Sequence, residues 1–418
     1  MRRHGILVPL ACSLALISAV AFAMSPPIVT KTGIDVLRER GFDILRGKRV
    51  GLITNPTGLT SDLQSTIDIL FRAEGVQLTA LYGPEHGVRG DAEAGKYIDT
   101  YVDKATGLPV YSLYGKTRKP TKEMLSGIDV LVYDIQDIGV RSYTYISTMG
   151  LAMEAAAENG LEFVVLDRPD PLTGNQVGGP MLEPQFKSFV GAFPVPYVYG
   201  MTAGELAEMI NGEGWLNGGR TCKLTVVPLQ GWNRSMWWDE TGLEWVPTSP
   251  HIPHASTTIF YVLTGLLGEL GTANQGVGYT LPFELIGAPW VRGGELAAYL
   301  NAQNLEGIRF RQMWYKPFYF DTTGIQYEGV QIHVIDRNKV DMTLVQVHIL
   351  DALLKLFPDW SIFDRARPER QNTFDKVVGT TDVRRWLQSR VEPAEIVRRL
   401  DQARAGFMIK REKYLKYE

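Results

Sequence analysis

A short polar cluster in the first quarter of the chain has the residue types of an acid catalyst. Residues 83–91 read GPEHGVRGD, so Glu85 and His86 stand between a proline and a glycine. These neighbours predict a tight loop, in which the Glu85 side chain does not belong to the packed face of a helix or strand. A partly desolvated carboxyl group in such a loop can hold its proton near neutral pH and act as a general acid, with His86 orienting it. The structural alternative for Glu85 is an ion pair with Arg89.

A second cluster offers the further carboxylates that a hydrolytic site of this kind needs. Residues 134–141 read DIQDIGVR, and either Asp134 or Asp137 can activate water or stabilise positive charge at an anomeric carbon. The separation from Glu85 decides between these roles, because about 5 Å suits a nucleophile and roughly 6.5–9.5 Å leaves room for a water molecule. We therefore expect Glu85, Asp134 and Asp137 to line one pocket.

Arginines and tyrosines in and beside these clusters suit a ligand that combines a carboxylate with a sugar ring. Arg89, Arg141 and Arg168 can each hold a carboxylate through two parallel hydrogen bonds, and Tyr143 and Tyr145 can pack against a ring. The polar residues that complete this predicted substrate-binding set are Asn55, Asp91 and Asp167. The structural alternative is that the arginines neutralise neighbouring carboxylates, while Asn, Asp, Gly and Pro form turns.

Several other mechanisms lack their sequence patterns. No serine lies in a Gly-x-Ser-x-Gly motif or three residues before a lysine, and no glycine-rich nucleotide-binding loop follows a predicted strand. His251 and His254 are separated by Pro253, which prevents a regular helical metal pair. We therefore expect neither a metal nor an organic cofactor. An esterase or amidase is a weaker alternative, because the chain has no serine or cysteine motif for it.

The polar clusters each follow a short apolar run, which explains how distant residues can meet. The runs predict strands at residues 49–54, 76–82, 130–133 and 163–166, with helical spacing at 63–73, 121–126 and 147–159. This alternation is typical of an α/β fold with a doubly wound parallel sheet. Ligands bind beyond the carboxyl ends of the strands in such sheets, so the clusters should converge at one edge.

The length of the chain and a change in composition predict a second, smaller domain. Residues 201–210 form the last helix expected in the first domain, with Thr202 and Glu205 as a capping box. Four tryptophans between residues 232 and 245, followed by three prolines, mark a boundary near 250. Beyond it, a strand at 330–334 and helices at 344–356, 381–388 and 393–407 indicate an α+β domain. We expect a Rossmann-like catalytic domain at 28–250 and a smaller domain at 251–418.

The N-terminus has the features of an export signal. Arg2 and Arg3 precede an apolar run that ends in AFA at residues 21–23, which predicts removal of residues 1–23. The mature protein is then periplasmic or secreted and has no stable membrane association; a retained membrane anchor is the alternative.

After this removal only one cysteine, Cys222, remains, which excludes an intrachain disulfide and a multi-cysteine zinc site. The formal net charge of −3 becomes more negative without the two arginines, so nothing favours nucleic acid as a partner.

Four long motifs give the chain a specific likeness to a known family. They are LYGPEHGVRGDAEAG at residues 81–95, DIQDIGVRSYTYISTMG at 134–150, LDRPDPLTG at 166–174 and PFELIGAPW at 282–290. With them the chain resembles the NamZ-type exo-β-N-acetylmuramidase family over residues 33–417. The resemblance implies a Rossmann-like domain joined to a smaller one, with the active cleft between them. It also implies release of N-acetylmuramic acid from the non-reducing end of peptidoglycan fragments, so the expected partner is a glycan or muropeptide.

The resemblance also assigns roles to particular residues. The family's Pro-Glu-His-Gly glutamate falls on Glu85, its Asp-Ile-Gln-Asp aspartates fall on Asp134 and Asp137, and Glu284 can serve the site. Two stretches depart from the family pattern: QGVGY at residues 275–279 stands for Glu-Gly-Arg-Gly-Thr, and TSPHIP at 248–253 stands for Pro-Ser-Pro-Asn-Met-Pro. If the lost groups bind substrate, the protein accepts a different glycoside or has lost activity. The alternative to an exo-acting hydrolase is therefore a binding protein for peptidoglycan-derived sugars, and the oligomeric state stays open.

Overall fold

The computed structural model describes residues 30–90, 100–319 and 323–418. The predicted export signal and Asp91 lie outside these ranges. Within them, no helix is long and apolar enough to cross a membrane.

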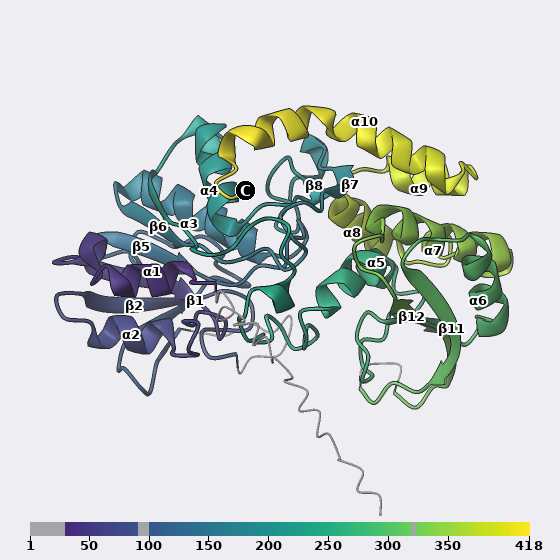
Figure 1. Cartoon of the computed structure of the whole chain (residues 1–418), viewed down its shortest axis with the longest axis horizontal. Helices are drawn as coiled ribbons and strands as arrows, with labels where there is room; N and C mark the ends of the chain where they lie inside the picture. The colour runs from purple at the N-terminus through teal and green to yellow at the C-terminus, as the bar shows by residue number, and fades with distance from the viewer. Residues whose placement is uncertain (1–29, 91–99, 320–322) are drawn as a thin grey trace, which may run out of the picture.

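A seven-stranded sheet forms the larger part of the molecule, with the strand order β3-β4-β2-β1-β5-β6-β9. Neighbouring strands are parallel except at one edge, where β3 runs antiparallel to β4. This order confirms the predicted doubly wound α/β fold, because β1 lies in the middle and the chain winds outward from it in both directions (Figure 1). The strands are β1 (Arg49–Thr54), β2 (Gln77–Gly83), β3 (Tyr101–Val102), β4 (Pro109–Ser112), β5 (Val130–Asp134), β6 (Glu162–Leu166) and β9 (Lys223–Val227).

Helices cover both faces of this sheet because alternate strand residues point to opposite sides. Val50, Leu52 and Val132 pack in one buried cluster with α1 (Gly33–Glu39) and α2 (Thr66–Arg72). Ile53 and Tyr133 pack in a second cluster with α3 (Tyr145–Asn159) and α4 (Ala203–Gly212). The central strands are therefore buried on both faces, which explains their continuous apolar runs.

The predicted helix ends in this part are confirmed, but one predicted helix is wrong. Gly160 ends α3 in the left-handed conformation, with φ 68°. Thr202 accepts a hydrogen bond from the Glu205 backbone at the start of α4, which confirms the capping box. Residues 122–127, in contrast, form consecutive turns in place of the helix predicted at 121–126. The segment is confined between Pro120 and Gly127, whose φ is 78°, and so short a run cannot offset the cost of helix nucleation.

A three-stranded antiparallel sheet forms the smaller part, with the order β10-β12-β11. The predicted strand at 330–334 lies within β12, and the predicted helices at 344–356, 381–388 and 393–407 correspond to α7, α9 and α10. The strands are β10 (Leu285–Ala288), β11 (Ile308–Tyr315) and β12 (Tyr327–Val334). The helices are α5 (Thr257–Leu270), α6 (Gly293–Ala302), α7 (Met342–Leu356), α8 (Pro368–Val378), α9 (Asp382–Gln388) and α10 (Pro393–Arg411).

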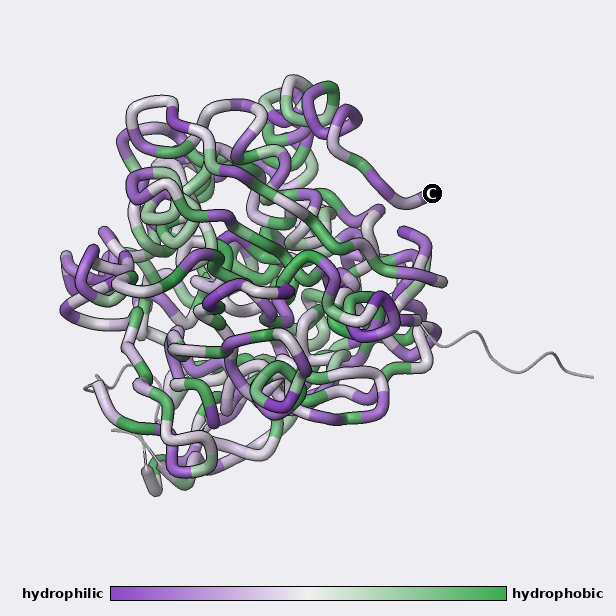
Figure 2. The backbone as a smooth tube through the Cα atoms, turned by 90° about the vertical axis from the view of Figure 1, so that its left-hand side faces the viewer, coloured by the Kyte–Doolittle hydropathy of each residue, from purple (hydrophilic) through white to green (hydrophobic). Residues whose placement is uncertain are grey.

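The two parts are joined through a shared core and a returning C-terminus. Between them lies a hairpin of β7 (Gly178–Met181) and β8 (Pro196–Val198). Val198 packs in one buried cluster with α5 and α7, and hydrophobic stretches cross the middle of the molecule in Figure 2. Helix α10 then runs back toward α4 (Figure 1), where Tyr417 donates a hydrogen bond of 2.6 Å to Asp167. Both parts therefore hold fixed positions around the segment between them.

Candidate active site

A cavity of about 300 Å³ brings Glu85 together with residues from both halves of the chain. Its walls combine carboxyl, imidazole, hydroxyl and aromatic groups, which suits a polar ligand with a ring. The lining residues are Glu85, His86, Ser142, Tyr143, Thr144, Tyr145, Ser249, His251, Ile252, Tyr261, Glu269 and Phe283.

Glu85 lies in the tight loop that its neighbours predict, directly after β2. His86 and Gly87 have φ values of 72° and 73°, and the Gly87 backbone donates a hydrogen bond of 3.0 Å to the carbonyl of Pro84. The chain reverses here, which leaves the half-buried Glu85 side chain on the cavity wall. The Thr144 hydroxyl donates to its carboxylate at 3.4 Å. Burial, followed by the charge of Glu85, raises the pKa of Tyr114 to about 12, so a neutral phenol stands beside the carboxyl group.

Tyr143 and Tyr145 form an aromatic wall of the same cavity, as the sequence predicts. Their ring centroids are 5.0 Å apart at an interplanar angle of 80°, and Tyr261 packs edge-on against Tyr143 at 5.9 Å. Both hydroxyls are fixed by one residue, because Tyr143 shares a hydrogen bond of 2.7 Å with the Thr248 hydroxyl and Tyr145 donates to the Thr248 carbonyl. The wall is therefore held in place before any ligand arrives.

Two histidines line the cavity, His86, which is predicted for the site, and His251, which is not. His86 is buried, and His251 stacks on Tyr319 with ring centroids 6.1 Å apart and a contact of 3.1 Å between Nε2 and the tyrosine oxygen. Burial lowers the pKa of His251, and His86 lowers it further. His251 is therefore a neutral ring at physiological pH, available as a hydrogen-bonding group rather than a charge.

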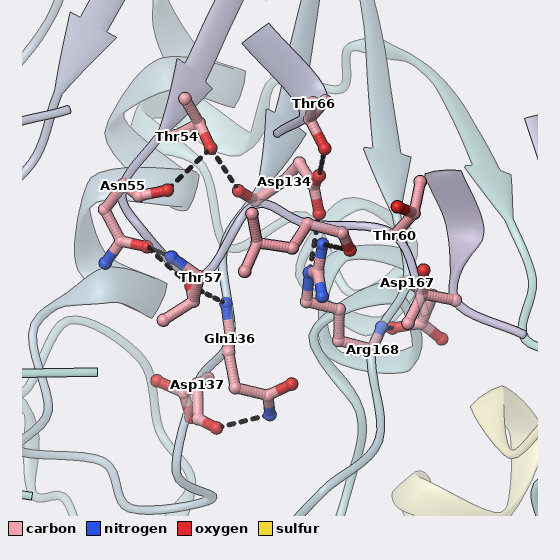
Figure 3. A network of polar contacts seen from close by, with 12 residues as sticks. Thr54, Asn55, Thr57, Thr60, Thr66, Asp134, Gln136, Asp137, Asp167 and Arg168 are labelled. Atoms are coloured by element: carbon pink, nitrogen blue, oxygen red, sulfur yellow. Dashed lines mark hydrogen bonds and ion pairs between the residues drawn. The ribbon is translucent and has the colours of Figure 1, made fainter. Parts of the chain in front are cut away.

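Asp134 and Arg168 form an ion pair at the carboxyl edge of the sheet and do not line the cavity (Figure 3). The Asp134 side chain is 0% exposed, and its oxygens accept hydrogen bonds of 2.6 Å from Arg168 Nε and 2.6 Å from the Thr66 hydroxyl. Arg168 also donates to the carbonyl of Leu59 at 2.7 Å. This geometry ties together the loops after β1, β5 and β6, so both side chains act on the framework rather than on a ligand in the cavity.

Asp137 is also buried and is absent from the cavity wall. Its Oδ2 accepts hydrogen bonds from the Tyr199 hydroxyl and, at 2.9 Å, from the Gly139 backbone. Burial raises the pKa of Asp137 to about 7, against the opposing effect of these two donors. The structure therefore does not bring the two predicted aspartates into the pocket of Glu85.

The two remaining arginines have their guanidinium groups occupied elsewhere. Arg141 is fully buried and donates to four backbone carbonyls, those of Pro180, Val195, Val377 and Val378, at 2.7–2.9 Å. Arg89 does not pair with Glu85 in an ion pair that the structure describes; it contacts Asp103 at 3.0 Å and Asp68 at 3.6 Å. Neither guanidinium faces the cavity, so their placement favours structural roles over the predicted binding of substrate.

The other predicted binding residues also lie off the cavity wall. Asn55 is buried and accepts a hydrogen bond of 3.0 Å from the Thr57 backbone, which forms a turn after β1 (Figure 3). Asp167 is fully buried and accepts from Thr202 at 2.7 Å and from Gly204 at 2.8 Å, at the start of α4. Glu284 is half-buried, and burial raises its pKa.

Helix α5 contributes cavity residues that the sequence analysis missed. Tyr261 and Glu269 both face the cavity, although the helix itself is mostly buried. Glu269 is the single acidic residue in the largely apolar run 257–270, which is the sequence signal that could have drawn attention to it. Gln275, at the departure from the family pattern, is not on the cavity wall; a Cβ atom added at Gly268 would meet its amide nitrogen at 2.3 Å.

Metal chemistry has no cluster of ligands to support it in the described part of the chain. No group of three or more His, Cys, Asp or Glu side chains there could hold a metal ion. The chemistry that the cavity offers on its own is proton transfer by carboxyl groups, beside hydroxyl and aromatic groups that can position a ligand.

Comparisons with known proteins agree along nearly the whole chain. Two family models match, described as the N-terminal part of exo-β-N-acetylmuramidase NamZ at residues 50–256 and its C-terminal part at 259–417. The peptidoglycan β-N-acetylmuramidase NamZ of Bacillus subtilis (strain 168) is 44% identical over 387 residues, which cover 93% of this chain and 91% of that protein.

Two solved structures of DUF1343 family proteins from Bacteroides fragilis NCTC 9343 share the fold. One has a TM-score of 0.89 and 52% sequence identity, with coverage of 94% of this chain and 100% of that chain. The other has a TM-score of 0.76 and 29% identity, with coverage of 93% and 99%. Both parts of the molecule therefore recur together in these relatives.

Proposed function

Because this chain belongs to the NamZ exo-β-N-acetylmuramidase family, we propose that it removes terminal N-acetylmuramic acid from peptidoglycan fragments, with Glu85 as the general acid. Family membership makes the protein a glycoside hydrolase that acts on peptidoglycan. We propose in addition that Glu85 is the acid catalyst and that the enzyme attacks the end of the glycan.

The observation that carries the proposal is the position of Glu85 on a cavity with an aromatic wall. Tyr143, held edge-on against Tyr145, can pack against one face of a pyranose ring. Glu85 lines the same cavity, with the Thr144 hydroxyl and the neutral Tyr114 beside it. A protonated Glu85 can then donate to the glycosidic oxygen as its bond to the anomeric carbon breaks. A cavity of about 300 Å³ suits one sugar unit rather than a long glycan, which agrees with attack at a chain end.

We further propose that the protein works outside the cytoplasm. Arg2, Arg3 and the AFA sequence at residues 21–23 support export with removal of the leader, and the substrate class is found there. N-terminal sequencing of the protein from the cell envelope would test this, since a chain that retains residues 1–23 would contradict it.

Hydrolysis of a chromogenic N-acetylmuramic acid β-glycoside tests the activity directly. The wild type should release the chromophore, and on a muramyl disaccharide, whose leaving sugar needs a proton, Glu85→Gln should lower kcat by roughly 10²- to 10⁴-fold while the melting temperature stays unchanged. Glu162→Gln is the matched control, because Glu162 begins β6 at the opposite end of the sheet and contacts Lys48 and Lys223 near the surface. Unchanged turnover of the disaccharide in Glu85→Gln would dismiss Glu85 as the acid.

A binding protein without catalysis is the second candidate, motivated by Gln275 and Val277 at the departure from the family pattern. Calorimetry with muropeptide fragments separates the two functions. Saturable binding without product after long incubation would favour the binding protein, whereas turnover of the same fragments would exclude it.

A further inference from the structure

A second carboxyl group lines the cavity, on an element of the other part of the molecule from the Glu85 loop. Glu269 lies one residue before the end of α5, in the smaller part of the molecule, whereas Glu85 follows β2 of the larger sheet. Of the described residues that line the cavity, Glu85 and Glu269 are the two with carboxyl groups. Hydrolysis of a glycoside ordinarily needs such a pair, and the buried Asp134 and Asp137 do not supply it.

We propose that Glu269 is the second carboxyl group of the hydrolytic site and acts as the general base for the attacking water. The inference rests on the proposed function, because it assigns a role in the same reaction. Glu269 would touch the water molecule and stand on the face of the sugar opposite the oxygen that Glu85 protonates.

The Glu269 carboxylate is not occupied by a structural partner in the described part of the chain. It makes no ion pair and no side-chain hydrogen bond there, whereas Asp134, Asp167 and Glu205 are each tied down by several donors. Arg370 of α8 contributes charge without forming an ion pair with it. A half-buried carboxylate that faces a cavity and lacks a structural partner has its oxygens available to a ligand or to water.

The surroundings of Glu269 favour a base over a nucleophile. Burial raises its pKa, and the charge of Arg370 opposes this only in part. A carboxylate whose pKa lies closer to neutral is a better proton acceptor, whereas a nucleophile or charge stabiliser is kept ionised by hydrogen bonds that Glu269 lacks.

The Tyr261 hydroxyl group, on the same helix as Glu269, belongs to a residue that also lines the cavity and can position water. Tyr261, two helical turns before Glu269, contacts the Ser142 hydroxyl at 3.2 Å. The Tyr197 hydroxyl is buried and lies 3.5 Å from where a Cβ atom at Gly265 would be. Gly265 is midway between Tyr261 and Glu269 on α5, so polar groups run along this helix toward the carboxylate.

The proposed step balances with water as the second substrate. Glu85 gives its proton to the glycosidic oxygen, and the bond between that oxygen and the anomeric carbon breaks with its electron pair moving to the oxygen. The water oxygen bonds to the anomeric carbon from the other face, and Glu269 takes the proton that the water loses. Proton exchange with solvent then restores the protonated Glu85 and the ionised Glu269. The released sugar has the inverted anomeric configuration.

Two variants and two substrates distinguish the base from the acid. Glu269→Ala should lower kcat by roughly 10²- to 10⁴-fold on both a muramyl disaccharide and an N-acetylmuramic acid β-glycoside with a dinitrophenol leaving group. Sodium azide should restore turnover of the dinitrophenyl glycoside and give the α-azide, because azide needs no base. Glu85→Ala should lose the disaccharide but keep cleavage of the dinitrophenyl glycoside, whose leaving group needs no proton. Loss of turnover in Glu269→Ala that azide does not restore would overturn the proposal.

The anomer released first gives an independent readout on the wild type. Proton NMR during hydrolysis of the β-glycoside should show the α-anomer before mutarotation, and the β-anomer first would overturn a base role. Glu269→Gln keeps the shape of the side chain. If its melting temperature matches that of the wild type, a loss of turnover in this variant is not due to a folding defect. If the wild type cleaves no muramyl glycoside, the proposed function fails; if it cleaves and Glu269→Gln stays within twofold, only the role of Glu269 fails.

Discussion

Arg168 Nε lies 2.6 Å from Oδ1 of Asp134, and the exposed fractions of the two side chains are only 6% and 0%. Each partner has a second fixed contact, Asp134 with the Thr66 hydroxyl and Arg168 with the Leu59 carbonyl. The pair thus joins three loops at the carboxyl edge of the sheet (Figure 3). Asp134, held in this way, does not line the cavity, where Glu85 and Glu269 are the two carboxyl-bearing residues among the described ones.

Breaking this ion pair should destabilise the fold more than it changes catalysis. Asp134→Ala leaves the Arg168 guanidinium buried without its partner, which costs about 3–5 kcal/mol of unfolding free energy. Urea denaturation measures the loss. The double variant Asp134→Leu with Arg168→Met removes both charges and should recover part of it, so a double variant whose loss equals the sum of the two single losses would contradict a coupled pair.

The buried Asp137 predicts a pH dependence of stability with a definite sign. Its pKa is raised by burial to about 7 in the folded protein, from an ordinary value of 3.8. The folded state therefore holds a proton that the unfolded state releases, and the stability this gives is lost as the pH rises toward about 7. Asp170, whose pKa burial also raises, shifts stability in the same direction.

Replacement of Asp137 by asparagine removes this effect while keeping an acceptor for Tyr199 and Gly139. We expect the unfolding free energy of Asp137→Asn, relative to the wild type, to rise with pH from about 4 to about 7, by up to about 1.4 kcal/mol per pH unit. Urea unfolding at several pH values measures the trend. Asp129→Asn is the control: Arg49 lowers the pKa of Asp129 to about 2, so its difference from the wild type should be constant between pH 5 and 7. A flat Asp137→Asn difference would contradict burial in the protonated form.

The framework of the larger sheet could be predicted because its strands have simple patterns. β1 and β5 are buried on both faces, so their runs are continuously apolar and their bounds follow from composition. Short elements could not be predicted from such patterns. The segment 121–126 carries helical spacing in the sequence, and the edge strand β3 has only two residues, with one of them exposed. In such segments neighbouring contacts decide the conformation.

A minority of the candidate site could be predicted, and burial explains why several other predicted residues do not belong to it. Glu85, Tyr143 and Tyr145 belong to clusters that follow strands, so topology brings them together. Asp134 and Arg141 have the same sequence signature, yet whether a polar side chain meets solvent or a buried partner depends on loops far away in the chain. Glu269 was missed for the opposite reason, since its helix looks like core and no strand end marks it.

Arg141 should act on stability rather than on substrate binding. Its guanidinium caps the last turn of α8 through the carbonyls of Val377 and Val378 and holds the β7–β8 hairpin through those of Pro180 and Val195. Arg141→Lys keeps the charge but has no planar fork to reach all four acceptors, and each buried carbonyl left without a donor costs about 1–3 kcal/mol. The melting temperature should fall, while KM for a muramyl glycoside stays within about twofold at a temperature where the variant is folded. A large rise in KM with unchanged stability would instead show that Arg141 contributes to substrate binding.

The aromatic wall should contribute to substrate binding through its ring and not through its hydroxyl. Tyr143→Phe removes the hydrogen bond of 2.7 Å to Thr248 but keeps the packing on Tyr145 and Tyr261, so KM should change by less than about threefold. Tyr143→Leu removes the flat surface, and the loss of an aromatic contact worth about 0.5–1.5 kcal/mol should raise KM by roughly 2- to 12-fold, with a smaller effect on kcat. Initial rates over a range of glycoside concentrations separate the two constants. Equal effects of the two variants would show that the hydroxyl, through Thr248, matters more than the ring; no effect of either would place the sugar against another wall of the cavity.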